Sequence, residues 1–233
     1  MSPQIAALLS EVTVLALPTI FAITLHEAAH GYIAHRCGDD TAWIMGRVTF
    51  NPLKHIDPIG TVVMPLFLFL ASGGKFLFGY AKPVPVSFHK LNHPRRDMVY
   101  VAAAGPATNV LLAVFSALLI YAVPLLPGSF QAWTESNLVY SVEINIILAV
   151  FNMIPLPPLD GGRVAVGILP DFLALPLARM ERFGLLILIA VLFLLPMIGD
   201  QLGMNLNIMA RIIEGPVNWI IGAIGWMTGV QVE

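Results

Sequence analysis

The stretch that decides the fold is LHEAAHGYIAHR, residues 25–36, which closes an apolar run that begins near residue 11. This run is long enough to cross the roughly 30 Å hydrocarbon layer of a bilayer as one helix. His26 would then lie about 15 Å from the helix end at Arg36, at 1.5 Å per residue. Ionisable groups at that depth are costly, so the two histidines and the glutamate of this stretch indicate a functional site.

The composition of the whole chain is that of a membrane protein. Of its 233 residues, 58% are hydrophobic and 11% are charged, and the mean hydropathy is +0.82. Soluble domains carry about 25% charged residues. The net charge of -2 and the absence of a long basic run argue against a nucleic-acid partner. We therefore expect the lipid bilayer to surround most of the chain.

Apolar runs of spanning length recur along the sequence, with no internal repeat between them. We expect an all-α polytopic membrane protein with about four to six transmembrane helices. It would form a single domain over residues 1–233, with a catalytic core at about 11–165 and C-terminal helices at about 171–230. The predicted spans are 11–36, 97–124, 137–154 and 182–199.

Two further apolar stretches are ambiguous. The run 58–72 is short and contains Pro65, so it need not cross the membrane. The stretch 204–229 carries Arg211, Glu214 and two tryptophans, so it could either span the bilayer or lie in the interface.

The motif within residues 25–36 has the spacing of a zinc site. His26 and His30 are four residues apart, which places both imidazoles on one face of a helix, with Glu27 beside that face. The pattern H-E-x-x-H supplies two zinc ligands and a general base for a metal-bound water. The alternative is a set of interhelical hydrogen bonds. The cost of unpaired ionisable groups in hydrocarbon favours metal binding.

A catalytic zinc ion needs a third protein ligand, and FNMIPLPPLDGGR, residues 151–163, offers Asp160. Three prolines directly after the predicted span 137–154 must end its regular hydrogen bonding, and the following glycines allow tight backbone. Irregular backbone at membrane depth is tolerated only where protein or a water-filled cavity satisfies it. The alternative is an exit loop in which Asp160 caps a helix that starts at Gly161.

Two motifs in this order carry a family resemblance. HEAAH at 26–30 together with NMIPLPPLDGG at 152–162 resembles the site-2 protease family of intramembrane zinc metalloproteases, whose pattern is H-E-x-x-H followed by N-x-x-P-x-P-x-L-D-G. AAGPATN at 103–109 is similar to the opening of that family's intervening core helix. The stretches GRVTFNPLKHIDPIGT and GYAKPVPV look like its compact bacterial branch, without a PDZ-like or nucleotide-sensing domain.

The resemblance covers roughly residues 20–165 and implies both a cofactor and a reaction. One zinc ion would be held by His26, His30 and Asp160, with Glu27 as the base. The reaction would be hydrolysis of peptide bonds within transmembrane protein substrates. The family suggests membrane-anchored regulators or remnants of signal peptides as substrates.

Two asparagines are further candidates. A neutral donor aimed at the tetrahedral intermediate contributes about 3 kcal/mol, and Asn152 is our candidate for that donor or for a bond to substrate backbone. The alternative is an asparagine that caps a broken helix. Asn109 is a weaker candidate for substrate binding, because AGPATN is also typical of helix packing in membranes.

Two other functions remain open from the sequence. A zinc transporter would also place histidine and aspartate in the membrane, but it would spread polar residues across the full bilayer depth. A catalytically silent binder of transmembrane segments is the third reading. The presence of Glu27 beside the histidines favours the enzyme.

Geometry predicts the topology. His26 lies near the C-terminal end of its helix and Asp160 just beyond the C-terminal end of another, so the two helices must run in the same direction. An odd number of crossings must then separate them, and 58–72 becomes a re-entrant hairpin. This arrangement brings the basic residues to one face, which the positive-inside rule makes the cytoplasmic face of an inner membrane. These residues are Arg36, Arg47, Lys54, Lys75, Lys82, Lys90, Arg95, Arg96, Arg163, Arg179 and Arg182.

A small β-sheet is predicted at the cytoplasmic border. FLFGYAKPVPVSF, residues 76–88, joins aromatic and β-branched residues to two prolines, which is typical of an edge strand. Paired with RVTF at 47–50, it could add an unwound substrate as a further strand, with Val84 and Val86 as contacts. The alternative is an ordinary interfacial loop.

Overall fold

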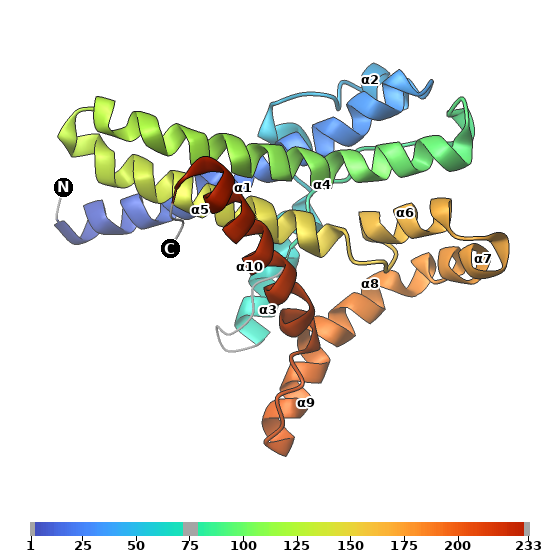
Figure 1. The fold of residues 1–233 in the computed structure, drawn as a ribbon. Helices are drawn as coiled ribbons and strands as arrows, with labels where there is room; N and C mark the ends of the chain where they lie inside the picture. Colours follow the sequence, from blue (N-terminus) through green and yellow to red (C-terminus); the bar gives the residue numbers. More distant parts are fainter. Residues whose placement is uncertain (1–2, 72–78, 231–233) are drawn as a thin grey trace.

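The computed structural model describes residues 3–71 and 79–230, and it is mostly helical (Figure 1). The α-helices are α1 Pro3–Arg36, α2 Thr41–Ile44, α3 Met64–Ala71, α4 Pro94–Leu119, α5 Gly128–Asn152, α6 Asp160–Ile168, α7 Asp171–Arg179, α8 Glu181–Ile189, α9 Leu195–Leu202 and α10 Ile208–Thr228. Shorter helical turns are η1 Pro52–His55, η2 Pro58–Val63, η3 Phe88–Lys90, η4 Ile120–Leu125 and η5 Ala190–Leu194.

Three long helices form the frame that carries the site. Helix α4 packs against α1, α5 and α6, and α1 also packs against α5. Figure 1 shows α1 and α5 running in the same direction, with α4 running the opposite way. The C-terminal half of α1 and the start of α6 therefore lie at the same level of the molecule, where His26, His30 and Asp160 can share one ion.

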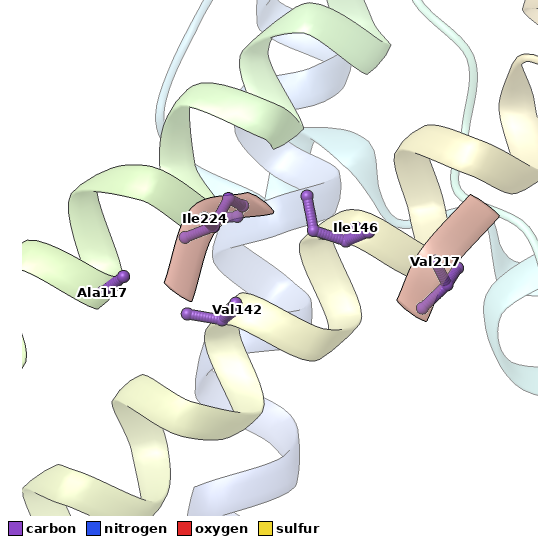
Figure 2. Packing of buried hydrophobic residues seen from close by; sticks show 6 residues of the cluster. Ala117, Val142, Ile146, Val217 and Ile224 are labelled. Atoms are coloured by element: carbon purple, nitrogen blue, oxygen red, sulfur yellow. The ribbon is translucent and has the colours of Figure 1, made fainter. Parts of the chain in front are cut away.

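An apolar core fixes α10 across this frame. Ala117 of α4, Val142 and Ile146 of α5, and Val217 and Ile224 of α10 are all buried and in contact (Figure 2). Alanine on α4 lets the branched side chains of the other two helices fill the space between them, as expected of close-packed membrane helices.

By length and composition, three helical stretches can span a membrane among the described residues, against the four to six expected. They are Ala7–Arg36, Pro94–Leu125 and Glu181–Leu202. The expected span 137–154 corresponds to the second half of α5, which is not among these three stretches and carries Ser141, Glu143 and Asn145. Ser141 and Asn145 form hydrogen bonds with Ser116 and Asn109 of α4, so these two polar side chains are turned toward α4.

The chain returns on itself after α3. Asp57 accepts hydrogen bonds from the N–H groups of Ile59 and Gly60 and so caps the start of η2, which continues into α3. The N–H of Tyr80 then donates to the carbonyl of Gly60 at 3.0 Å. The predicted run 58–72 is helical up to Ala71, and its last residue lies outside the described part of the chain.

The predicted β-sheet is not present in the described residues, since neither 47–50 nor 79–88 forms a strand. Residues 79–87, which we call the strap, have no regular secondary structure and bind other partners. The N–H of Lys82 donates to the carbonyl of His55, and Arg47 donates through its side chain to the carbonyls of Lys82 and Pro83. Pro83 and Pro85 have no N–H to offer a ladder. Residues 76–78 of the predicted strand lie outside the described part.

Candidate metal centre

A glycine on α4 gives the two histidines of α1 their space. A Cβ at Gly105 would lie 2.5 Å from Nε2 of both His26 and His30. Only a residue without a side chain allows α4 to approach the histidine face of α1 this closely. The stretch AAGPATN thus shapes the site from the side opposite the HEAAH motif.

The connection between α5 and α6 positions Asp160. After Asn152 the chain turns through the prolines, and α6 begins at Asp160 itself. A Cβ at Gly161 would collide with the backbone of Met153, so glycine is needed where α6 starts against this turn. The Asp160 side chain does not cap a helix. Its carboxylate points at the two histidines of α1.

The structure thus brings the three predicted ligands together in a buried group. Nε2 of His30 lies 3.0 Å from Nε2 of His26. Oδ2 of Asp160 lies 3.1 Å from His26 Nε2 and 3.3 Å from His30 Nε2. Ligands held about 2.0–2.1 Å from a tetrahedral zinc ion lie about 3.3 Å apart, so these spacings fit that ion.

The protonation of the rings supports the same fit. Nδ1 of His30 faces the carbonyl of Val101 at 2.7 Å, and Nδ1 of His26 faces Oδ1 of Asn109 at 2.5 Å. Both partner oxygens accept only, so each Nδ1 carries a proton, and in the neutral imidazole each Nε2 then presents a lone pair. Two lone pairs and a carboxylate oxygen that face one another need a shared cation. Such outer hydrogen bonds are typical of metal-ligating histidines.

Asn109 does not lie where the predicted contact with substrate would require it. Its side chain is fully buried between helices and does not line the pocket described below. Its Oδ1 instead accepts a hydrogen bond from Nδ1 of His26, on the side of the ring away from Asp160. Val101, Gly105 and Asn109 follow one another at four-residue spacing, which puts all three on the face of α4 turned to the histidines. The spacing is visible in the sequence, but only the structure shows that this face of α4 meets the histidines of α1.

A cavity of about 480 Å³ opens beside the three ligands. Glu27, Asn152 and the strap residues Val84 and Val86 line it, together with apolar side chains of α4, α5 and α8. Oε2 of Glu27 accepts a hydrogen bond of 2.7 Å from the N–H of Val84. The carboxylate is therefore held in the pocket wall next to the ligand group.

The other predicted residues lie in the same cavity. Asn152 donates one N–H to the carbonyl of Leu148 at 3.0 Å, which leaves its second N–H for another acceptor. Within the described part of the chain, the N–H of Val86 has no hydrogen-bond partner. Arg163 and Glu181, which the sequence analysis did not propose, form an ion pair in the cavity wall at 3.0 Å.

Asp39, just beyond α1, anchors the far end of the strap. It accepts hydrogen bonds from the N–H of Ser87 at 2.6 Å and from the N–H of Thr41 at 3.0 Å. Burial alone would raise the pKa of the Asp39 carboxyl, but the bonds from the Thr41 hydroxyl and these N–H groups outweigh it and lower that pKa. The strap is thus fastened at Val84 and at Ser87 by carboxylates.

Comparisons with known proteins give relatives that are named as zinc metalloproteases. The family model "Peptidase family M50" matches residues 127–195, which include Asp160. The chain is 36% identical over 194 residues to "Putative zinc metalloprotease YwhC" of Bacillus subtilis (strain 168), covering 81% of this chain and 84% of that protein. It is 29% identical over 208 residues to "Putative zinc metalloprotease Rip2" of Mycobacterium tuberculosis (strain ATCC 25618 / H37Rv), covering 89% and 70%. No solved structure gives a significant match. The likeness to the Bacillus protein extends over most of both chains, and this chain belongs to peptidase family M50, the site-2 protease family of metalloproteases.

Proposed function

We propose that this protein is an intramembrane zinc endopeptidase that hydrolyses peptide bonds in or near transmembrane segments of membrane-anchored proteins. The observation that carries the proposal is the position of Glu27. Its carboxylate lines the same largely apolar cavity as a buried three-donor metal group, on a helix long and apolar enough to span a membrane.

Each residue has a defined task in this reaction. His26, His30 and Asp160 would hold the zinc ion, which when bound polarises the scissile carbonyl and lowers the pKa of water. Glu27 takes the proton of the attacking water and passes it to the leaving amine. The hydrogen bond from Val84 keeps the Glu27 carboxylate oriented toward the cavity. Asn152 offers its free N–H to the developing oxyanion or to substrate backbone.

The substrate would enter as an unwound segment. A peptide bond inside a regular helix is shielded, and its freed backbone groups must be re-paired in an apolar cavity. The strap supports this proposal because Val86, whose N–H has no partner within the described part of the chain, lines the cavity. Val86→Pro removes this donor and should slow cleavage of a membrane-spanning substrate while zinc content stays normal. Cleavage at the normal rate would rule out pairing at Val86.

We also propose that the segment from Pro58 to the strap is re-entrant and that the ligand group lies toward the cytoplasmic side of an inner membrane. The bond between Tyr80 and Gly60 supports the first point, because both ends of the segment then lie at one level. The clustering of lysine and arginine supports the second.

The test is cleavage of a membrane-spanning peptide by the purified protein in liposomes. Zinc-dependent cleavage should occur with the native protein and be lost in Glu27→Ala, which should keep its zinc. Glu143→Gln is the matched control, because Glu143 is also a carboxylate on a helix of the frame but does not line the cavity. Zinc flux without cleavage would favour a transporter. Peptide binding without cleavage would favour the silent binder.

A further inference from the structure

A chain of polar side chains runs from the metal centre into the interface between α4 and α5. Asn109 of α4 and Asn145 of α5 are 0% and 1% exposed. Nδ2 of Asn109 donates to Oδ1 of Asn145 at 2.8 Å. Buried polar groups between membrane helices are costly unless they are paired, so two such amides in contact need an explanation.

Backbone carbonyls fix the direction of both amides. Nδ2 of Asn145 donates to the carbonyl of Ser141 at 2.8 Å, which can only accept, so Oδ1 of Asn145 must face Asn109. Nδ2 of Asn109 likewise donates to the carbonyl of Ala22 at 3.3 Å. Oδ1 of Asn109 must therefore face His26. Each amide oxygen in the chain therefore accepts from the next group: Asn145 accepts from Asn109, and Asn109 accepts from His26.

The direction matters for metal binding. With its oxygen toward His26, Asn109 accepts from Nδ1–H and leaves Nε2 bare for a metal ion. A flipped amide would present its NH₂ group to Nδ1, and the ring proton would then move to Nε2 and block the ligand position. Asn145 opposes that flip, because its oxygen needs the Asn109 NH₂ group as donor.

We propose that Asn145 is a positioning residue for the metal ligand His26, acting through Asn109. This inference rests on the proposed metal site. Asn145 lies seven residues before Asn152, outside the family pattern, and does not line the cavity. Its contribution reaches the site only through the orientation of the Asn109 amide.

The measurement is zinc affinity of the full-length purified protein, by competition with a chromogenic chelator. Asn145→Leu, which removes the acceptor, should weaken zinc binding by about tenfold, and Asn109→Leu by about 10–100-fold, the range for outer-shell partners of zinc-bound histidines. Asn145→Asp, which burial keeps protonated, can donate its O–H to the Ser141 carbonyl and keep its other oxygen as the acceptor toward Asn109, so its affinity should stay within about twofold of native. Ser116→Ala is the matched control. It removes a buried hydrogen bond to Ser141 in the same interface and should leave zinc affinity unchanged.

The double variant tests the route of the effect. If Asn145 acts through Asn109, Asn109→Leu combined with Asn145→Leu should bind zinc no more weakly than Asn109→Leu alone. The visible spectrum of the cobalt-substituted protein should change in Asn145→Leu and not in Ser116→Ala. Should Asn145→Leu fail to fold, Asn145→Ser shortens the side chain out of reach of Asn109 and should give the same loss.

Two results would overturn the proposal: native zinc affinity in folded Asn145→Leu or Asn145→Ser, or losses that add fully in the double variant. Absence of zinc binding by the native protein would instead overturn the proposed function. The two failures are therefore distinguishable.

Discussion

Gly105 decides at the residue scale whether the metal group can form. Its missing side chain leaves the space against Nε2 of His26 and His30. Gly105→Ala should place a methyl group there and reduce zinc binding by at least tenfold, although alanine is the better helix former by about 1 kcal/mol. Metal analysis of the purified variant checks this.

Gly222→Ala on α10 is the control for this substitution, because a Cβ there meets nothing within 4 Å. It should keep full zinc content. Full zinc content in Gly105→Ala as well would show that α4 does not confine the ligands.

Replacement of Asn152 tests whether zinc binding and the rate of peptide hydrolysis can be separated. Asn152→Ala should retain zinc, since the side chain bonds Leu148 and none of the ligands. Its turnover of a membrane-spanning peptide should fall about 10²-fold, the typical cost of removing one donor to an oxyanion. Single-turnover kinetics measure the chemical step. An unchanged rate would make Asn152 a structural residue of the α5 terminus.

The residues of the candidate metal centre could be predicted from the sequence, whereas those that orient them could not. His26, Glu27 and His30 follow from helical spacing, and Asp160 from the need for a third ligand. The part played by Asn109 and Asn145 depends on which face of α4 meets α1 and α5, and a pattern along one helix does not reveal its neighbours.

The strap is the feature that matters most at the scale of elements. Its prolines and β-branched residues predicted an edge strand, but the partners of its N–H groups are the carboxylates of Glu27 and Asp39 and the carbonyls of Gly60 and His55. The described residues 79–88 therefore do not form the predicted strand. The choice of side-chain carboxylates over a second strand could not be predicted from the sequence, because it depends on where α1 ends.

The hydrogen bonds of the Asp39 carboxylate should make the stability of the folded protein depend on pH. The pKa of Asp39 is lowered in the folded protein, chiefly by hydrogen bonds that overcome its burial. Its contribution to stability is then present above the unfolded value of about 3.9 and is lost as the pH falls through the lower folded value. Asp39→Ala should lower the melting temperature at pH 7, and this difference from native should shrink below about pH 4.

Thermal unfolding in detergent at both pH values measures this difference. Asp200→Ala, at an exposed position on α9, should match the native protein throughout. A difference for Asp39→Ala that persists unchanged at acid pH would mean that the carboxylate does not supply the stabilisation.

Topology is the issue at the scale of the whole molecule. The parallel course of α1 and α5 was expected from the need to share one ion, and Figure 1 shows it. The number of spans was not predictable, because α5 places Asn145 and Ser141 against α4 and so lacks the uniform hydropathy of a lipid-exposed helix.

Cysteine labelling of intact cells tests the re-entrant segment. In a Cys37→Ser background, Lys54→Cys and Lys82→Cys lie before and after it at exposed positions, and both should react only when the cytoplasmic side is accessible. Gly128→Cys, at the far end of the span Pro94–Leu125, should react from the outside. Labelling of positions 54 and 82 from opposite sides would refute the re-entrant course.

The most direct test of the account is the zinc content of the purified protein by mass spectrometry. The native protein and Glu27→Gln should each carry about one zinc ion per chain, as a catalytic site with three protein ligands binds a single ion. Asp160→Ala, which removes one ligand and leaves the helices of the frame intact, should carry almost none. Full zinc content in Asp160→Ala, or loss of zinc in Glu27→Gln, would contradict the assignment of ligands and base.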